Sequence, residues 1–272
     1  MIPISSFVGI GIMIAGGILL PVIVCILWLK RTKEKFTTVL VGAATWFVFA
    51  IVLETIPKYF LFNPATSIGR KVLGSVVLYT IVGALLAGVF EEVGRYIAFK
   101  TVLKKRTNKE TGISHGIGHG GFEAMFLMGY AGIQYIIFSV MINTGAFQEL
   151  ISQTAATGID VSSLEALPGQ IMSITPLTSI VSILERVFAM LLHVGLSIMV
   201  FFAVRDSKVG LLLLAILLHA FFDVPAAMYQ AGVLNLYVTE FVLACYALIF
   251  FVIVYRMYKK APREKEIIDT AQ

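Results

Sequence analysis

The chain has 272 residues, of which 58% are hydrophobic and 14% are charged, with a mean hydropathy of +0.92 and a formal net charge of +5. Soluble domains carry about a quarter of their residues as charged side chains, so this composition excludes an ordinary soluble protein. No polar stretch is long enough to bury a core of its own. We therefore expect a lipid bilayer around the protein and no nucleic acid among its partners.

Seven apolar runs come close to or exceed the roughly 20 residues that cross a bilayer as a helix. They predict an all-α, polytopic membrane protein, built as a single transmembrane helical domain over 1–272 with a catalytic-like core over 73–229. No basic region precedes the first run, which predicts a retained helix and not a signal peptide. The predicted spans are 7–29, 38–60, 73–101, 117–143, 176–203, 210–229 and 235–257.

The basic residues predict how the spans are oriented, because cytoplasmic loops carry an excess of Lys and Arg. One side of the predicted topology carries Lys30, Arg31, Lys33, Lys35, Lys100, Lys104, Lys105, Arg106, Lys109, Arg205, Lys208, Arg256, Lys259, Lys260, Arg263 and Lys265. The opposite side carries only Lys58, Arg70 and Lys71. This places the N-terminus outside and the C-terminus in the cytoplasm. The long connection 144–175 lies outside and is consistent with short surface helices.

Ionisable side chains inside a membrane span are costly, and they usually mark a functional site or a buried partner. In the predicted spans these residues are Glu91, Glu92, Arg95, His115, His119, Glu123, Glu185, Arg186, His193, His219 and Asp223. All four histidines of the chain are among them. Glu54 also lies in a span, but Lys58 follows it at the spacing of a local helical ion pair.

Spacing places several of these groups on common helix faces. His219 and Asp223 are four residues apart, and Arg186 and His193 are seven apart, which is two helical turns. At 1.5 Å per residue, Glu91 lies about 27 Å along the third span, close to its inner end. We expect the set to meet in one cavity in the cytoplasmic half of the bilayer. A purely structural charge network is the alternative, although structure alone rarely requires so many desolvated charges.

The stretch "HGIGHGGFEAM", residues 115–125, combines histidines and a glutamate with four glycines. Glycine weakens a helix, so helical geometry is not expected before Gly121. The sequence instead predicts a tight cytoplasmic turn that enters the fourth helix and brings His119 and Glu123 into the site.

Carboxylates beside histidines in a water-excluding pocket suit proton transfer and the stabilisation of an oxyanion. Peptide hydrolysis needs both and can proceed without a covalent nucleophile. The chain has no HExxH zinc motif and no GxSG serine motif. Asp223 is the single aspartate predicted inside a span, which excludes a two-aspartate site.

Four strings in order, "EEVGRY", "HGIGHGGFEA", "ER" followed by His193, and "HAFFD", resemble the motifs of the glutamic intramembrane protease superfamily. That superfamily includes the CAAX prenyl proteases, the bacteriocin-processing proteins and PrsW. The strings look most like its YhfC branch, and the resemblance covers about residues 91–223.

The resemblance implies an intramembrane endopeptidase that acts on a membrane-anchored protein or peptide. Glu91 would activate water, with Glu92 and Arg95 in support. His219 and Asp223 would match the last family motif, which faces the oxyanion.

The chain departs from the CAAX pattern in two motifs. Arg95 is one residue closer to the glutamates than in EExxxR, and the second motif is not FxxxH, so whether His119 or Glu123 completes the water site stays open. Arg186 and His193 have no CAAX counterpart and look more like PrsW.

Members of this branch have been called metalloproteases, and three protein ligands plus water make a catalytic zinc site. Zinc is therefore the alternative to a metal-free glutamic site, which the motifs favour. The candidate ligands are His115, His119, Glu123, His193, His219 and Asp223.

Two rival functions remain. Intramembrane Glu, His and Asp residues also form the proton relays of transporters, although the sequence shows no internal repeat of the kind many transporters have. A non-catalytic membrane binding or sensor protein is the second rival, and retention of the full set of charged residues argues against it.

Overall fold

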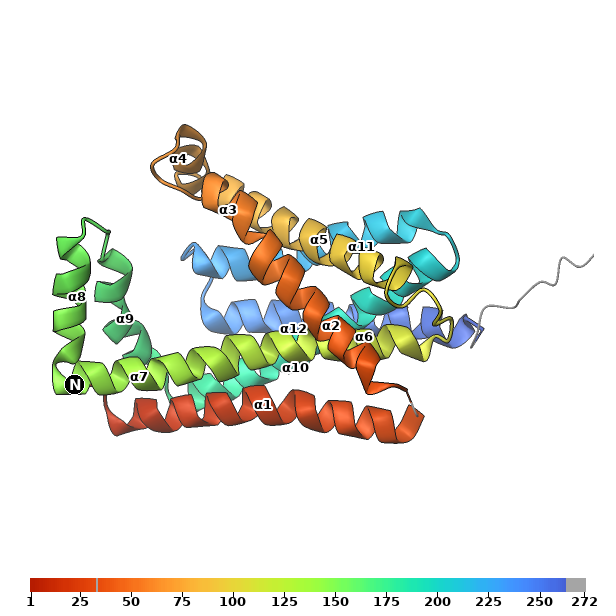
Figure 1. Cartoon of the computed structure of the whole chain (residues 1–272), viewed down its shortest axis with the longest axis horizontal. Coiled ribbons are helices and arrows are strands. Elements are labelled where there is room, and N and C mark those ends of the chain that lie inside the picture. Colours follow the sequence, from red (N-terminus) through yellow and green to blue (C-terminus); the bar gives the residue numbers. More distant parts are fainter. Residues whose placement is uncertain (33, 263–272) are drawn as a thin grey trace, which may run out of the picture. The chain divides into compact units, whose positions relative to one another are not determined.

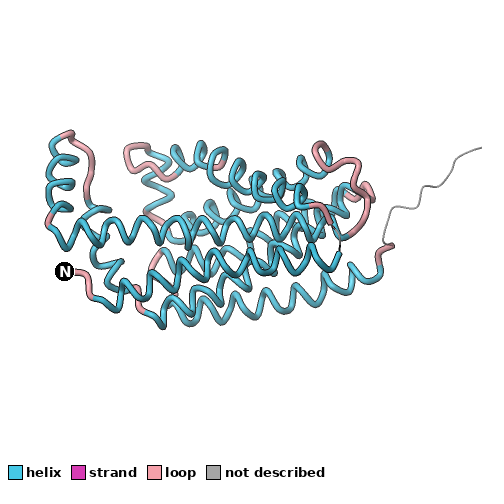
Figure 2. The backbone as a smooth tube through the Cα atoms, turned by 60° about the horizontal axis from the view of Figure 1, so that its bottom comes forward, coloured by secondary structure: helices cyan, strands magenta, loops and turns pink. Residues whose placement is uncertain are grey.

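The computed structural model describes residues 1–32 and 34–262 of the chain. Within these residues all regular secondary structure is helical (Figure 2), which confirms the all-α prediction. Three basic residues that were used to predict the orientation, Lys33, Arg263 and Lys265, lie outside the described residues.

Seven helices of the described chain are long and apolar enough to cross a membrane, as predicted. Helices α2 and α3 are joined by the π-helical segment η1, and helices α6 and α7 by the π-helical segment η2. The seven spans consist of α1 (Ile4–Thr32); α2 (Phe36–Trp46), η1 (Phe47–Leu53) and α3 (Thr55–Leu61); α5 (Val76–Lys100); α6 (Glu110–Ala124), η2 (Met125–Tyr130) and α7 (Ala131–Thr144); α10 (Pro176–Arg205); α11 (Val209–Gln230); and α12 (Leu236–Lys260). The predicted ends agree within three residues, except that the fourth span begins at Glu110.

Three short helices lie between the spans: α4 (Ser67–Leu73), α8 (Ala146–Ala156) and α9 (Ser162–Ser173). The last two confirm the short helices expected in 144–175. Local signals fix several helix ends. The hydroxyl of Thr66 accepts a hydrogen bond from Gly69 N at the start of α4. Gly145, with φ 85°, ends α7 in the left-handed conformation that glycine adopts without strain.

Helix packing divides the chain into two compact units. Unit 1 contains Met1–Val22 and Ala124–Val187, and unit 2 contains Ile23–Glu123 and the residues from Phe188 onward. The unit boundaries therefore fall inside α1, at the end of α6 and inside α10. The prediction of a single domain stays a prediction.

Unit 1 is held together by apolar side chains and by hydroxyl bonds to backbone carbonyls. Ile10 and Ile171 are fully buried at the centre of its apolar cluster. The hydroxyl of Ser179 donates to the carbonyl of Gly9 at 2.8 Å. Ile2 N donates to Asn143 Oδ1 at 2.6 Å, so the N-terminus lies at the end of α7, near α8 (Figure 1).

In unit 2, helices α5 and α11 lie side by side (Figure 1). Their close approach depends on Gly88, because a Cβ at that position would lie 2.7 Å from the carbonyl oxygen of Ile216. A large apolar cluster that includes Phe99, Leu196 and Phe250 fills one part of this unit. The polar site described below lies on α5, α6, α10 and α11 of the same unit.

Several helix ends of unit 2 meet one another. Asn108, between α5 and α6, donates to Glu34, which follows α1, at 2.7 Å. Arg205, at the end of α10, donates to the carbonyl of Pro262 beyond α12 at 3.2 Å. Lys109, just before α6, donates to the carbonyl of Ala261 beyond α12 at 2.9 Å and links these two contacts. The ends of the first, third, fifth and seventh spans thus gather together, as alternating spans require. That this side is cytoplasmic stays a prediction.

The expected turn at 115–120 is wrong, because α6 is helical from Glu110 to Ala124. Its glycines allow close helix packing instead of a turn. A Cβ at Gly118 would overlap the carbonyl of Val39 in α2, and one at Gly116 would lie 2.5 Å from the Cα of Val194 in α10. Tertiary packing therefore outweighs the low helix propensity of this segment.

Candidate active site

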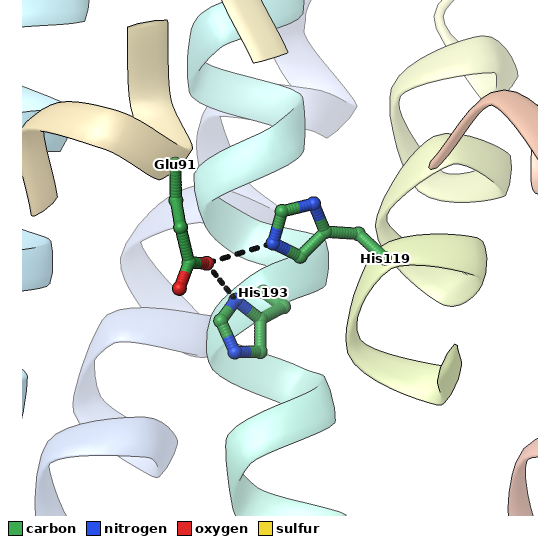
Figure 3. A group of neighbouring side chains, drawn as sticks. All are labelled: Glu91, His119 and His193. Carbon is green, nitrogen blue, oxygen red and sulfur yellow. Dashed lines mark hydrogen bonds and ion pairs between the residues drawn. The ribbon is translucent and has the colours of Figure 1, made fainter. Parts of the chain in front are cut away.

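Three buried side chains from three helices of unit 2 point toward one another (Figure 3). They are Glu91 of α5, His119 of α6 and His193 of α10, and we call them the triad. Glu91 Oε2 lies 2.8 Å from His119 Nε2 and 4.0 Å from His193 Nδ1. One potential ligand atom from each residue lies within 4.8 Å of the other two. The sequence predicted all three residues for the site, and the structure brings them together.

Glu92 and Arg95 form a second, fully buried cluster beside the triad. Arg95 Nη1 donates to Glu92 Oε1, which also bonds His219 Nδ1 at 2.6 Å. The second guanidinium nitrogen of Arg95 reaches the triad, because its Nη2 lies 2.7 Å from His193 Nδ1 and 3.6 Å from Glu91 Oε2. Arg95 therefore neutralises Glu92 and also links that carboxylate to the triad.

Glu123 adds a carboxylate on the other side of the His193 ring, where its Oε2 lies 2.5 Å from His193 Nε2. An arginine can only donate hydrogen bonds, so the contact with Arg95 makes His193 Nδ1 an acceptor. The ring proton then lies on Nε2, which faces the carboxylate of Glu123. This tautomer directs the Nδ1 lone pair toward Glu91 and Arg95.

His219 and Asp223, one helical turn apart on α11, lie at the more open edge of the site. His219 Nε2 is 3.9 Å from Glu91 Oε2 and 3.6 Å from Asp223 Oδ2. The side chain of Asp223 is 39% exposed, whereas that of Glu91 is 8% exposed. The predicted pairing of His219 with Asp223 is therefore a loose contact, and Glu92 is the residue that fixes the His219 ring.

His115 is fully buried next to the triad but has different partners. Its Nδ1 lies 3.2 Å from the hydroxyl of Ser197, and its Nε2 lies 3.4 Å from the hydroxyl of Thr45. Its ring centroid is 6.0 Å from that of His119. Sequence reasoning missed both hydroxyls, although Ser197 follows His193 by one helical turn on α10. A metal-ligating role for His115 stays a prediction.

Two other charged residues that the sequence singled out, Glu54 and Arg186, form ion pairs within their own units. Lys58 Nζ lies 2.7 Å from Glu54 Oε1, which confirms the local ion pair predicted there. Arg186 belongs to unit 1, where its guanidinium bonds the carboxylate of the preceding residue, Glu185. The predicted role of Arg186 in the site stays a prediction.

The triad fits a divalent metal ion in donor type and in charge. Two imidazoles and one carboxylate are a ligand set of catalytic zinc sites. His119 Nδ1 is buried without a hydrogen-bond partner in the described part of the chain. No hydrogen bond at Nδ1 therefore prevents the small ring movement that metal binding at Nε2 would need. The site also carries two buried carboxylates, Glu91 and Glu92, beside the one guanidinium of Arg95, which leaves an excess of negative charge at this pair. A buried cation offsets such an excess.

One contact limits this fit. The guanidinium of Arg95 lies on the Nδ1 lone pair of His193, which is the atom that faces Glu91. A metal at that atom requires Arg95 to give up this hydrogen bond. The remaining bond of Arg95 to Glu92 keeps its charge paired.

Comparisons with known proteins identify the family of the chain. A model of the YhfC intramembrane metalloprotease family matches residues 16–244. The chain is 33% identical over 211 residues to the uncharacterized membrane protein YhfC of Bacillus subtilis (strain 168), covering 77% of this chain and 80% of that protein. No solved structure matches the chain. The matched range contains every residue of the triad and its neighbours, and the chain is a multi-pass membrane protein that belongs to the YhfC intramembrane metalloprotease family.

Proposed function

We propose that the protein is a metal-dependent intramembrane endopeptidase, which hydrolyses a peptide bond in a membrane-anchored protein or peptide. The triad carries this proposal, because it gathers two imidazoles and a carboxylate in a buried place between membrane-spanning helices. Glu91, His119 and His193 would hold the ion. When bound, such an ion supplies a Lewis acid and lowers the energy needed to form a hydroxide nucleophile.

The neighbouring residues have separate roles in this proposal. Glu123 accepts the Nε2 proton of His193 and so keeps the Nδ1 lone pair directed into the site. Glu92 accepts the Nδ1 proton of His219 and fixes that ring. The Nε2 of His219 can donate only when the ring carries a second proton, as imidazolium beside the Glu92 carboxylate. In that state His219 would donate to a developing oxyanion, or pass the Nε2 proton to the leaving nitrogen, in the space between Glu91 and Asp223.

A second candidate is the metal-free glutamic mechanism, in which Glu91 itself takes the proton from water. The hydrogen bond from Arg95 to His193 Nδ1 favours it, because a positive charge already lies next to the triad. In this reading His119 Nε2 donates to Glu91 at 2.8 Å and orients the carboxylate. The two candidates use the same residues, but Glu91 holds the metal ion in the first and takes the proton from water in the second.

The experiment pairs metal analysis with cleavage. The wild type and the variants Glu91→Gln, His119→Gln and His193→Gln are purified in detergent, assayed for zinc, and reconstituted with a membrane-anchored reporter peptide. Glu54→Gln is the matched control, because it removes another buried carboxylate of unit 2 that pairs with Lys58 outside the triad. We expect stoichiometric zinc in the wild type and the control, and loss of zinc and cleavage in each triad variant.

Other results separate the alternatives. Cleavage by a metal-free wild type, which persists with chelator and is lost in Glu91→Gln, would establish the glutamic mechanism. Tightly bound zinc without cleavage of any membrane-anchored reporter would contradict the protease and favour transport or sensing. Folding of each variant is checked by its elution volume and its thermal transition in detergent.

A further inference from the structure

A cavity of about 180 Å³ lies at the helix ends of unit 2, away from the triad. Its floor contains two buried aromatic rings, Phe99 at the end of α5 and Phe201 near the end of α10. Its lining includes four cationic side chains, which are Lys100, Lys104, Arg106 and Arg205. The lining contains no carboxylate. We call this cavity the basic pocket.

The guanidinium groups of the basic pocket have donors to spare. Arg106 uses Nη1 and Nη2 on the hydroxyls of Thr38 and Thr37, and no other bond to it occurs among residues 1–32 and 34–262. A guanidinium has five N–H groups, so about three of them are left for another acceptor. The two threonine bonds also hold the side chain in place, which reduces the entropy lost when an anion binds.

Arg205 is held just as firmly. Its side chain is 3% exposed and it packs over the ring of Phe202, with 4.5 Å from Cζ to the ring centroid. It bonds Asp206, which is the one carboxylate that pairs with a cation of the basic pocket in the described part of the chain. The pocket therefore has four cations against one neighbouring carboxylate.

The two lysines complete the pocket from its exposed rim. Lys100 Nζ donates to the hydroxyl of Tyr96 at 3.3 Å, and the ammonium lies 5.2 Å from the centroid of the same ring. Lys104 makes no hydrogen bond or ion pair with any described residue, so all three of its N–H groups are available. An anion in the pocket would therefore accept hydrogen bonds from the two held arginines and from the two exposed lysines.

The pocket lies where the spans α5 and α10 end, which is where a membrane-spanning helix meets the headgroup layer. Basic pockets between transmembrane helices at that level bind the headgroups of anionic lipids. We propose that the basic pocket binds the phosphate group of an anionic phospholipid. The volume, several times the roughly 30 Å³ share of one water molecule, accommodates a phosphate group. This proposal does not depend on the proposed function of the triad.

The test measures lipid binding to the full chain in detergent, by native mass spectrometry and by the thermal transition. The probes are dioctanoyl-phosphatidylglycerol, zwitterionic dioctanoyl-phosphatidylcholine and inorganic phosphate. The test variant is Lys100→Gln with Lys104→Gln, both on the exposed rim. The matched control is Lys259→Gln with Lys260→Gln, which removes the same charge from exposed residues at the end of α12, outside the pocket.

We expect the wild type and the control to bind phosphatidylglycerol in preference to phosphatidylcholine. The test variant should bind it at least tenfold more weakly, because each lysine near a membrane surface contributes about fivefold to anionic lipid binding. An equal loss of lipid binding in the control would overturn the proposal, because it would show that surface charge in general attracts the lipid. Unchanged lipid binding in the test variant would also overturn the proposal, because the pocket lysines would then not contribute. If inorganic phosphate binds as tightly as the lipid, and is lost in the same variant, the pocket is a site for a soluble phosphate and the lipid assignment fails.

Discussion

The two units differ in what they bury between their helices. Unit 1 packs around apolar side chains such as Ile10 and Ile171, and its buried hydroxyls bond to backbone carbonyls. Unit 2 holds all four histidines of the chain, together with two fully buried charges, Glu92 and Arg95. An apolar interior is sufficient to pack membrane helices, as unit 1 demonstrates. The desolvated charges of unit 2 are therefore better explained by chemistry than by stability.

The largest expected effect comes from removing a buried charge of unit 2, the feature that unit 1 lacks at the centre of its apolar cluster. Arg95→Met leaves Glu92 buried without its cation, and we expect about 3–5 kcal/mol loss of unfolding free energy. The measurement is denaturant- or heat-induced unfolding in detergent. Arg70→Met is the control, because Arg70 is exposed and its hydrogen bonds to described residues go to the carbonyls of Pro64 and Ala65.

The double variant Glu92→Gln with Arg95→Met removes both charges and should recover part of the loss. If Arg95→Met costs no more than Arg70→Met, the buried pair of Glu92 and Arg95 contributes no more to stability than an exposed arginine of the same unit.

A second comparison concerns two glycines, one packed against a neighbouring helix and one with open space beside it. Gly118→Ala places a Cβ against the carbonyl of Val39, so α2 and α6 must separate, and we expect about 1–3 kcal/mol of destabilisation. Gly11→Ala in unit 1 meets no atom within 4 Å. Because alanine favours a helix over glycine by up to about 1 kcal/mol, this second variant should be neutral or stabilising. The midpoints of thermal unfolding of the two variants are measured side by side. A similar loss of stability in both variants would contradict the packing role of the α6 glycines.

A third prediction sharpens the proposed metal site. Glu123→Gln weakens the hydrogen-bond acceptor for His193 Nε2, and we expect zinc affinity to fall about 10- to 100-fold. Competition with a chromogenic chelator measures this without any activity assay. Glu149→Gln in unit 1 removes an exposed carboxylate that accepts a bond from Gln153, and it should leave the affinity unchanged. Equal affinities in the wild type and Glu123→Gln would separate Glu123 from the metal site.

The smallest effect is expected in unit 1. Ser179→Ala removes the hydrogen bond to the carbonyl of Gly9, worth about 1 kcal/mol of stability, and should not change zinc content. The unfolding transition and the metal assay are run on the same preparation. Loss of zinc in this variant would contradict the assignment of metal binding to unit 2 alone.

Much of the fold could be predicted because hydropathy reports the membrane spans directly. All seven were located, and the gathering of charges on α5, α6, α10 and α11 followed from helical spacing. The sequence did not predict which of the site residues contact one another, because the side chains that face Glu91 depend on how each helix is rotated about its axis. His119 and His193 both face Glu91, whereas the nearby His115 turns to the hydroxyls of Thr45 and Ser197.

The clearest error concerned α6. Local reasoning treated its glycines as helix breakers, but Gly116 and Gly118 are the positions where the backbones of α10 and α2 come closest. Propensity is a local quantity, and the cost of glycine in a helix is outweighed where a neighbouring backbone occupies the space of a side chain. A single sequence does not reveal which glycines have such a neighbour.

The length of the fourth span has a consequence for how the bilayer acts on the site. Its 35 residues extend about 52 Å at 1.5 Å per residue, while the hydrocarbon core is about 30 Å thick. Usual tilts of up to about 40° do not bring such a number of helical residues within the hydrocarbon, so we expect part of the span to lie outside it. A thicker or thinner bilayer would then surround a different part of the fourth span. Because Gly118, next to His119, packs against the backbone of Val39, we expect the depth of His119 to depend on helix packing more than on lipid chain length.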